Sequence, residues 1–126
     1  MRILCKYLGL ILVALSGIAL ACSSRNCSQL PAKFTNYQEV QLIISKTNFP
    51  FEESVRTWKS SWIDKISYYS CDGRFGFLVM KTNNRTYVHK GVPIRLWYAF
   101  KNADSFGRFY NQNLKGRFRL EVKYKK

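Results

Sequence analysis

Apolar residues follow two different periods along the chain, and the change of period divides the sequence into a helical part and a strand part. From Tyr37 to Ser45 they recur three and four positions apart, which predicts a short amphipathic helix. Asn36 and Glu39 fit the reciprocal N-cap and N3 pairing at a helix start. Pro50 follows the end of the pattern, as expected after a helix.

The stretch from Glu52 to Ser61 carries a weaker form of the same pattern. Val55, Trp58 and Trp62 are spaced as on one helical face, although two serines interrupt the run. We predict a second short helix here.

From Ile63 onward the apolar period changes to two, which is typical of half-buried strands. Asp72-Gly73 separates two alternating runs, and this dipeptide predicts a tight type I′ hairpin turn. A second turn at Asn83-Asn84, residues that tolerate positive φ, leads into a third run over Thr86–His89. The sequence therefore predicts a three-stranded antiparallel meander.

A helix is predicted directly after the third strand. Pro93 suits a first helical turn, and apolar residues at helical spacing continue to Ala103. Gly107 is placed to end this helix with a left-handed cap. The apolar residues beyond it predict a further turn or short strand beneath the sheet: Phe109, Tyr110, Leu114 and Phe118. The predicted fold class is α+β, a three-stranded antiparallel β-meander packed by a following helix and preceded by one or two short helices.

The N-terminus has the pattern of a secretory signal peptide. Arg2 and Lys6 form a short basic region, Leu8–Leu20 is apolar, and Ala19-Leu20-Ala21 is a small-x-small processing site. The apolar run is shorter than the roughly 20 residues that span a bilayer, so we predict export and no transmembrane helix. The expected division of the chain is a signal peptide (1–21), a tether (22–33), an N-terminal helical segment (34–60), a domain (61–120) and a basic tail (121–126).

Two processing routes are open at Cys22. The preceding segment resembles a bacterial lipobox, which would make Cys22 the first mature residue and the site of lipid attachment, although Ala19 stands where that pattern usually has leucine. Ala19 and Ala21 also suit ordinary signal peptidase, which would release a soluble protein. We prefer a lipid anchor that holds the protein at the membrane, facing the periplasm.

The number of cysteines supports that preference. Cys5 leaves with the signal, so the mature chain keeps three cysteines in an oxidising compartment, and one must be spare. If lipid modifies Cys22, then Cys27 and Cys71 remain as a disulfide pair. The alternative for Cys71 is a buried free thiol on an alternating strand.

The charge is strongly one-sided. The 126 residues include 21 Lys+Arg and 7 Asp+Glu, for a formal net charge of +14. Residues 64–126 hold 14 of the basic and 4 of the acidic residues, which points to an anionic partner or to a solubilising surface. The few Pro and Gly residues exclude low-complexity and disordered classes, and the length leaves no room for a separate cofactor domain.

No catalytic, metal or cofactor site can be assembled from the sequence. His89 is the only histidine, the acidic residues are scattered, and neither a glycine-rich phosphate loop nor metal-ligand spacing occurs. We expect His89 on a strand surface or at a sheet edge, and a protein that is not an enzyme.

Short motifs follow one another in the second half of the chain: Ser61-Trp62-Ile63, Thr86-Tyr87-Val88-His89, Gly91-Val92-Pro93, Ala103-Asp104-Ser105-Phe106-Gly107 and Leu114-Lys115-Gly116-Arg117-Phe118. In this order and spacing they resemble the KTSC domain, a module named after the C-terminus of some lysyl-tRNA synthetases. The family's central Tyr-x-Tyr stands here as Tyr87-Val88-His89. The resemblance implies a domain without established catalysis, for which RNA binding has been suggested.

Basic residues near the end of this segment form the candidate binding site: Arg108, Lys115, Arg117 and Arg119. The intervening apolar residues would anchor the segment and leave the basic side chains outward. The predicted function is a non-enzymatic, exported binding protein of the bacterial cell envelope, whose basic surface faces an anionic macromolecule or lipid surface.

Two alternatives stay open. A module that binds RNA or single-stranded DNA would stack bases on exposed rings, for which the candidates are Tyr68, Tyr69, Tyr87, Phe109 and Tyr110. The same rings would equally fill the core beneath a half-buried sheet. A structural envelope lipoprotein, attracted to anionic lipid heads by its charge, is the other alternative.

Overall fold

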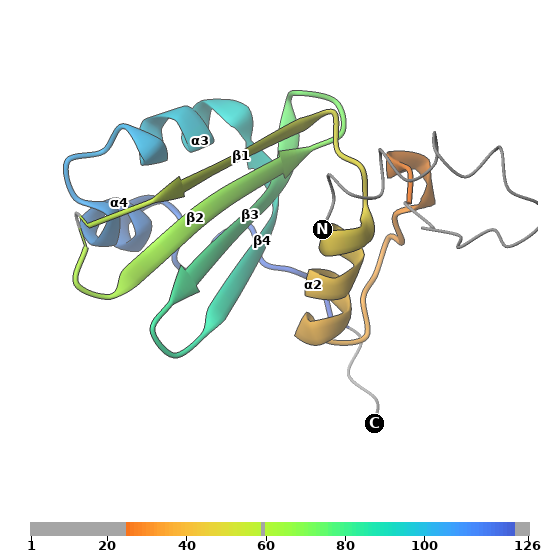
Figure 1. Cartoon of the computed structure of the whole chain (residues 1–126), viewed down its shortest axis with the longest axis horizontal. Coiled ribbons are helices and arrows are strands. Elements are labelled where there is room, and N and C mark those ends of the chain that lie inside the picture. The colour runs from red at the N-terminus through yellow and green to blue at the C-terminus, as the bar shows by residue number, and fades with distance from the viewer. Residues whose placement is uncertain (1–24, 59, 123–126) are drawn as a thin grey trace, which may run out of the picture.

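The structure is a computed structural model that describes residues 25–58 and 60–122, so the predicted signal peptide, Cys22 and the last four residues lie outside it. Its elements are η2 (Cys27–Gln29), α2 (Tyr37–Lys46), β1 (Phe51–Arg56), β2 (Ile63–Ser70), β3 (Phe75–Thr82), β4 (Thr86–Pro93), α3 (Ile94–Lys101) and α4 (Phe106–Asn113). The strands form one antiparallel sheet in the order β1-β2-β3-β4, with α2 over one face and α3 and α4 over the other (Figure 1). The α+β class is confirmed.

The sheet has four strands because the stretch predicted as a second helix is the edge strand β1. Its burial alternates residue by residue, and Phe51 and Val55 pack against the core on the α3 side. The helical spacing of Val55, Trp58 and Trp62 was therefore misleading. Because β1 pairs with β2 along its whole length, residues 34–60 are not a separate helical segment.

The first hairpin turn is wider than predicted. Four residues, Cys71–Arg74, connect β2 to β3, and of these only Gly73 has a positive φ, of 72°. A type I′ turn needs two such residues. The Asp72 carboxylate instead holds the loop, because its Oδ1 accepts from the backbone N–H groups of Arg74 at 2.8 Å and Phe75 at 3.0 Å. The second turn lies at Asn83-Asn84, as predicted.

Helix α3 ends at Lys101, six residues before the glycine predicted to cap it. Gly107 lies inside the first turn of α4, whose N-cap is Ser105. The Ser105 hydroxyl accepts from the Arg108 backbone N–H at 3.3 Å. The reason for a glycine is contact rather than capping, since a Cβ at Gly107 would stand 2.9 Å from Trp62 Nε1.

The core on the α3 and α4 side is strongly aromatic. Tyr68 and Trp97 are fully buried and stack with ring centroids 5.6 Å apart. The Tyr68 hydroxyl donates to the Val92 carbonyl at 2.7 Å, and burial raises the pKa of this phenol to about 12. Phe100 and Phe106 extend the same core. The sheet is thereby joined to both C-terminal helices.

The opposite face of the sheet is covered by the N-terminal segment. Val40, Ile43 and Ile44 of α2 pack with Phe77 and Val88 of the sheet in a second buried cluster. The predicted α2 helix is confirmed, with one residue more at its end.

The start of α2 follows the predicted pairing only in part. The Asn36 side chain accepts from the Glu39 backbone N–H at 2.8 Å, as expected of an N-cap. The Glu39 carboxylate, however, accepts from the N–H and hydroxyl of Thr35, both at 2.6 Å. Glu39 therefore bonds Thr35, the residue before the N-cap, and not the backbone N–H of Asn36 as predicted.

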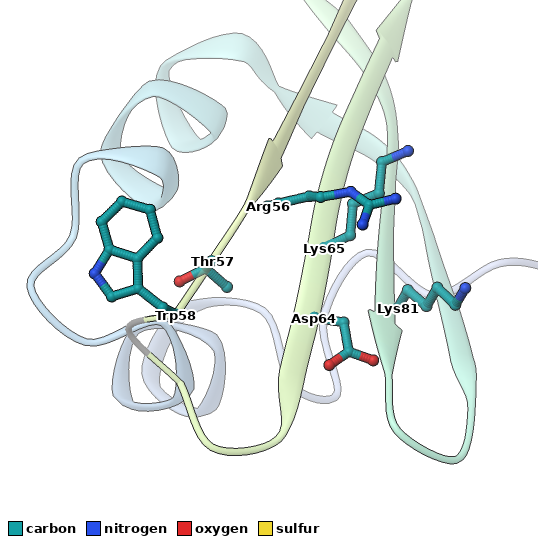
Figure 2. A pocket seen from close by; sticks show the side chains of 6 residues that line it. All are labelled: Arg56, Thr57, Trp58, Asp64, Lys65 and Lys81. Atoms are coloured by element: carbon teal, nitrogen blue, oxygen red, sulfur yellow. The ribbon is translucent and has the colours of Figure 1, made fainter.

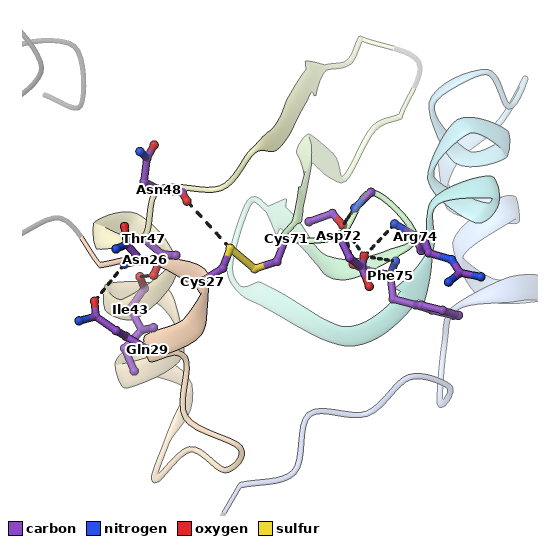
Figure 3. The surroundings of a disulfide bond; sticks show 12 residues. Asn26, Cys27, Gln29, Ile43, Thr47, Asn48, Cys71, Asp72, Arg74 and Phe75 are labelled. Carbon is purple, nitrogen blue, oxygen red and sulfur yellow. Dashed lines mark hydrogen bonds between the residues drawn. A yellow bond between two sulfur atoms is a disulfide. The ribbon is translucent and has the colours of Figure 1, made fainter.

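The predicted disulfide between Cys27 and Cys71 is present, with the two Cα atoms 5.8 Å apart. It ties the segment before α2 to the loop between β2 and β3 (Figure 3). The disulfide thus holds the N-terminal segment to the sheet that this segment covers.

Candidate anion-binding surfaces

The segment after α4 is fixed along the free edge of β4. Gly116 and Phe118 both have positive φ, of 75° and 53°, which turns the chain back toward the sheet. The Lys90 backbone N–H then donates to the Phe118 carbonyl at 2.9 Å, and Arg119 pairs with His89 as an antiparallel bridge. Leu114 and Leu120, both buried, anchor the two ends of this segment.

His89 is part of this attachment: it lies at the sheet edge, one of the two predicted places, but it is not on the surface. It lies on the edge strand, yet only 7% of it is exposed, because Tyr110 and the C-terminal segment cover it. Its Nδ1 is 3.1 Å from the Arg117 carbonyl oxygen. A carbonyl can only accept, so Nδ1 carries a proton and donates. Nε2 is buried without a hydrogen-bond partner among the described residues.

Burial lowers the pKa of His89, and the hydrogen bond to the Arg117 carbonyl raises it by a smaller amount. The imidazole is therefore neutral at neutral pH. A neutral ring suits a buried site in which one nitrogen has no partner, because a charged ring would need two acceptors.

The four predicted binding residues are all exposed: Arg108, Lys115, Arg117 and Arg119. The Arg119 guanidinium lies 3.9 Å from where a Cβ on Gly116 would stand, so it folds back over the turn between Lys115 and Arg117. Arg108 lies in the first turn of α4, about 10 Å along the helix from Lys115. The structure therefore groups three of the four at one turn and places Arg108 at the other end of α4.

A second basic group, which the sequence analysis missed, lies on the sheet. In the strand register Arg56 is opposite Lys65, and Lys65 is opposite Lys81. Together with Thr57, Trp58 and Asp64 they line an open hollow of about 560 Å³ (Figure 2). We call Arg56, Lys65 and Lys81 the sheet cations.

The sheet cations share the α2 face of the sheet but lie beyond the cluster that α2 covers. Lys65 lies four positions before Tyr69 on β2, and Lys81 lies two positions after Val79 on β3, so each shares its face with a residue of that cluster. No described carboxylate forms an ion pair with any of the three. Adjacent strands are about 4.8 Å apart, and like charges directly opposite each other destabilise a sheet.

This group is not visible in the sequence because register is a property of the folded sheet. Lys65 and Lys81 are 16 positions apart, and the apolar spacing around Arg56 predicts a helix. The available signal was the alternation from Phe51 to Arg56, which places Arg56 on the face opposite Val55.

Most aromatic rings considered for base stacking are used in packing. Tyr68 is fully buried, Tyr110 is 7% exposed, and Tyr69 and Phe109 are partly buried. Tyr87 is the exposed member of the set, and with Trp62 it borders a smaller hollow of about 230 Å³ next to the Asn83-Asn84 turn.

Within residues 25–58 and 60–122, no three His, Cys, Asp or Glu side chains are grouped so that they could hold a metal ion. The same part of the chain contains no helix of the length and apolarity needed to cross a bilayer.

Comparison with known proteins finds matches in the second half of the chain. Residues 59–118 match the KTSC domain family. The chain belongs to this family. A crystal structure of a KTSC domain protein from Yersinia pestis is 33% identical, covers 55% of this chain and 93% of its own, and gives a TM-score of 0.47. No curated protein matches the chain.

The motif residues of the KTSC domain have structural roles in this fold. In Gly91-Val92-Pro93, Val92 is buried and accepts the Tyr68 hydroxyl, and Pro93 is the N-cap residue of α3. Ser105 caps α4, and Gly107 permits its contact with Trp62. Lys65 and Lys81 lie within the matched residues, whereas α2, Cys27 and Arg56 precede them.

Proposed function

We propose that this KTSC domain protein is a non-enzymatic, lipid-anchored binding protein of the bacterial cell envelope. Its basic C-terminal turn, which carries Lys115, Arg117 and Arg119, would bind an anionic partner. The acyl chain on Cys22 would hold the protein at the membrane. The N-terminal residues that favour export and the odd number of mature cysteines support the location.

One observation carries the binding role: three cations are presented on a turn that is fixed in place. Lys115, Arg117 and Arg119 are exposed. The Lys90 backbone N–H and the His89 side chain, both of β4, bond the carbonyls of Phe118 and Arg117 and so hold this segment. Charges on a fixed segment keep a defined geometry toward a ligand, whereas charges on a frayed tail give only diffuse attraction. An anionic lipid surface is the partner that best suits a protein anchored beside it.

The binding role is tested with vesicles that contain an increasing fraction of anionic lipid. Replacing Arg117 and Arg119 by Ala should weaken binding several-fold, by roughly 1 kcal/mol or more. Deleting Lys123–Lys126 should mainly flatten the salt dependence. The matched control is Arg74→Ala with Arg95→Ala, which removes the same charge from exposed positions elsewhere.

The result that contradicts this role is a double Arg117 and Arg119 variant that binds like the wild type while the tail deletion abolishes binding. Affinity that follows oligonucleotide length rather than the anionic lipid fraction would instead favour a nucleic-acid-binding module. Circular dichroism must show the same fold in every variant.

The anchor is tested separately by intact-mass analysis of the membrane fraction. We expect a protein that begins at Cys22 and carries added acyl mass. The Cys22→Ser variant should move to the soluble periplasmic fraction. Unmodified wild-type protein in that fraction would contradict the anchor.

A further inference from the structure

We propose that the sheet cations, Arg56, Lys65 and Lys81, form a second binding site that takes a compact ligand with two neighbouring phosphate groups. This site goes beyond the proposed function, which places binding at the C-terminal turn. The proposal rests on the register of the sheet, on the absence of a pairing carboxylate among the described residues, and on the limits of the charged row.

The register brings the three positive groups onto three adjacent strands. Two strand spacings separate the outer members, so the row spans roughly 10 Å. Figure 2 shows the Arg56 side chain extending from β1 across β2 toward the end of Lys65, with Lys81 beyond it on β3. A ligand placed over β2 would therefore meet positive charge from both sides.

The chemistry of the three side chains suits phosphate. The Arg56 guanidinium offers a planar fork that matches two oxygens of one phosphate. Lys65 and Lys81 add mobile ammonium groups, which act as point charges toward a second phosphate. Two phosphates would also relieve the repulsion between cations that stand directly opposite each other.

The surroundings limit the ligand to a compact one. The row stops at β1, the edge of the sheet, and on β4 the residue opposite Lys81 is the uncharged Thr86. Asp64 also lines the hollow, where its carboxylate lowers the total positive charge and can accept from a ligand hydroxyl. A nucleic-acid strand would instead need a basic track that follows its backbone. We therefore assign the site to a diphosphate group, free or as part of a lipid headgroup.

The uncovered row also predicts an unusual response to mutation. Removing charge from Lys65 or Lys81 relieves cross-strand repulsion, so the protein without ligand should become no less stable. Replacing a residue that only supports the fold would instead lower the stability. Stability and binding thus separate a ligand site from a structural one.

The test titrates the full exported protein with inorganic pyrophosphate at two salt concentrations by calorimetry. We expect Lys65→Gln with Lys81→Gln to weaken binding about tenfold or more, while the melting temperature stays equal or rises. The control Arg74→Gln with Arg95→Gln has the same net charge and should bind nearly as the wild type does. Arg117→Ala with Arg119→Ala should also retain pyrophosphate binding, whether or not the C-terminal turn binds lipid.

Two further ligands distinguish the source of the phosphate groups. If the protein binds vesicles with a diphosphate lipid more tightly than vesicles of the same charge with a monophosphate lipid, the ligand is a lipid headgroup. If it binds free pyrophosphate more tightly than either vesicle, the ligand is soluble. Either result supports the site if the Lys65 and Lys81 variant loses it. No pyrophosphate binding by the wild type, equal binding by that variant, or affinity that grows with oligonucleotide length would overturn the proposal.

Discussion

The Trp97 indole N–H donates to Glu53 Oε2 at 2.6 Å, which joins the first C-terminal helix to the edge strand β1. Lys101 lies one helical turn further on and forms an ion pair with the same carboxylate at 3.0 Å. Trp97 is fully buried, whereas Glu53 is only partly buried. Glu53 therefore satisfies a buried donor and at the same time closes the edge of the sheet onto α3.

Replacing Glu53 by Ala should lower the free energy of unfolding by about 1 to 3 kcal/mol, because the buried Trp97 N–H loses its acceptor. Glu53→Gln keeps an acceptor oxygen and loses only the ion pair with Lys101, which is worth about 1 kcal/mol or less at this exposure. Urea denaturation followed by tryptophan fluorescence gives both values. Equal losses in the two variants would show that the ion pair, and not the Trp97 bond, is the main contribution.

The hydrogen bond from Trp97, and then that from Lys101, hold the pKa of Glu53 below its usual value of 4.5. A carboxyl whose pKa is lowered by folding contributes stability above pH 4.5 and loses it as the pH falls through the lowered value. Wild type should therefore lose more stability than Glu53→Gln when the pH falls below 4.5. Parallel pH profiles of the two proteins would contradict this assignment.

Removing the disulfide should destabilise the domain without abolishing the sheet. Cys27 and Cys71 are 44 positions apart, and opening a loop of this size costs about 2 to 4 kcal/mol. Cys27→Ser with Cys71→Ser, and the wild type with reductant, should give the same lowered denaturation midpoint. A wild-type midpoint that reductant leaves unchanged would mean that the two thiols are free in the protein as isolated.

The predictions that succeeded depend on local pattern. Helix α2 was predictable because its apolar spacing, its N-cap Asn36 and the proline after it all lie within a short stretch of sequence. The β2 and β3 strands followed from alternation. The Cys27–Cys71 pair followed from counting the cysteines expected to remain after export, with Cys22 set aside for lipid.

The predictions that failed depend on contacts between distant segments. Strand β1 was assigned to a helix because only its pairing with β2 distinguishes the two interpretations. Gly107 was assigned to a helix end because the sequence does not reveal that Trp62 packs against it. The edge position of His89 is confirmed, but its burial was not predictable because the residue that covers it, Arg117, lies 28 positions later.

Gly107→Ala should destabilise the protein by about 1 to 3 kcal/mol, since a methyl group there would stand 2.9 Å from Trp62 Nε1 and force the Trp62 side chain away from α4. Trp62→Leu should remove most of this cost, because the obstructing indole edge is gone. Thermal unfolding of both single variants and of the double variant measures the coupling. Additive effects would contradict the steric explanation, because alanine is otherwise the better helix former.

His89 should make the attachment of the C-terminal turn sensitive to pH. Burial lowers its pKa, so the unfolded chain binds the proton more readily than the folded one. Its contribution to stability is therefore complete above pH 6.5 and is lost as the pH falls from 6.5 toward the lowered value. The protonated ring would place a donor on the buried Nε2, which has no partner among the described residues, beside the Tyr110 ring. Unfolding free energies of wild type and His89→Gln between pH 8 and 5 test this, together with amide hydrogen exchange at Lys90, whose N–H is bonded to Phe118.

We expect the wild type to lose stability between pH 8 and 5 and the Lys90 amide to exchange faster relative to its intrinsic rate. The His89→Gln variant should show a flatter stability profile. A wild-type profile that is flat from pH 8 to 5 would show that the ring can accept a proton without loosening the turn.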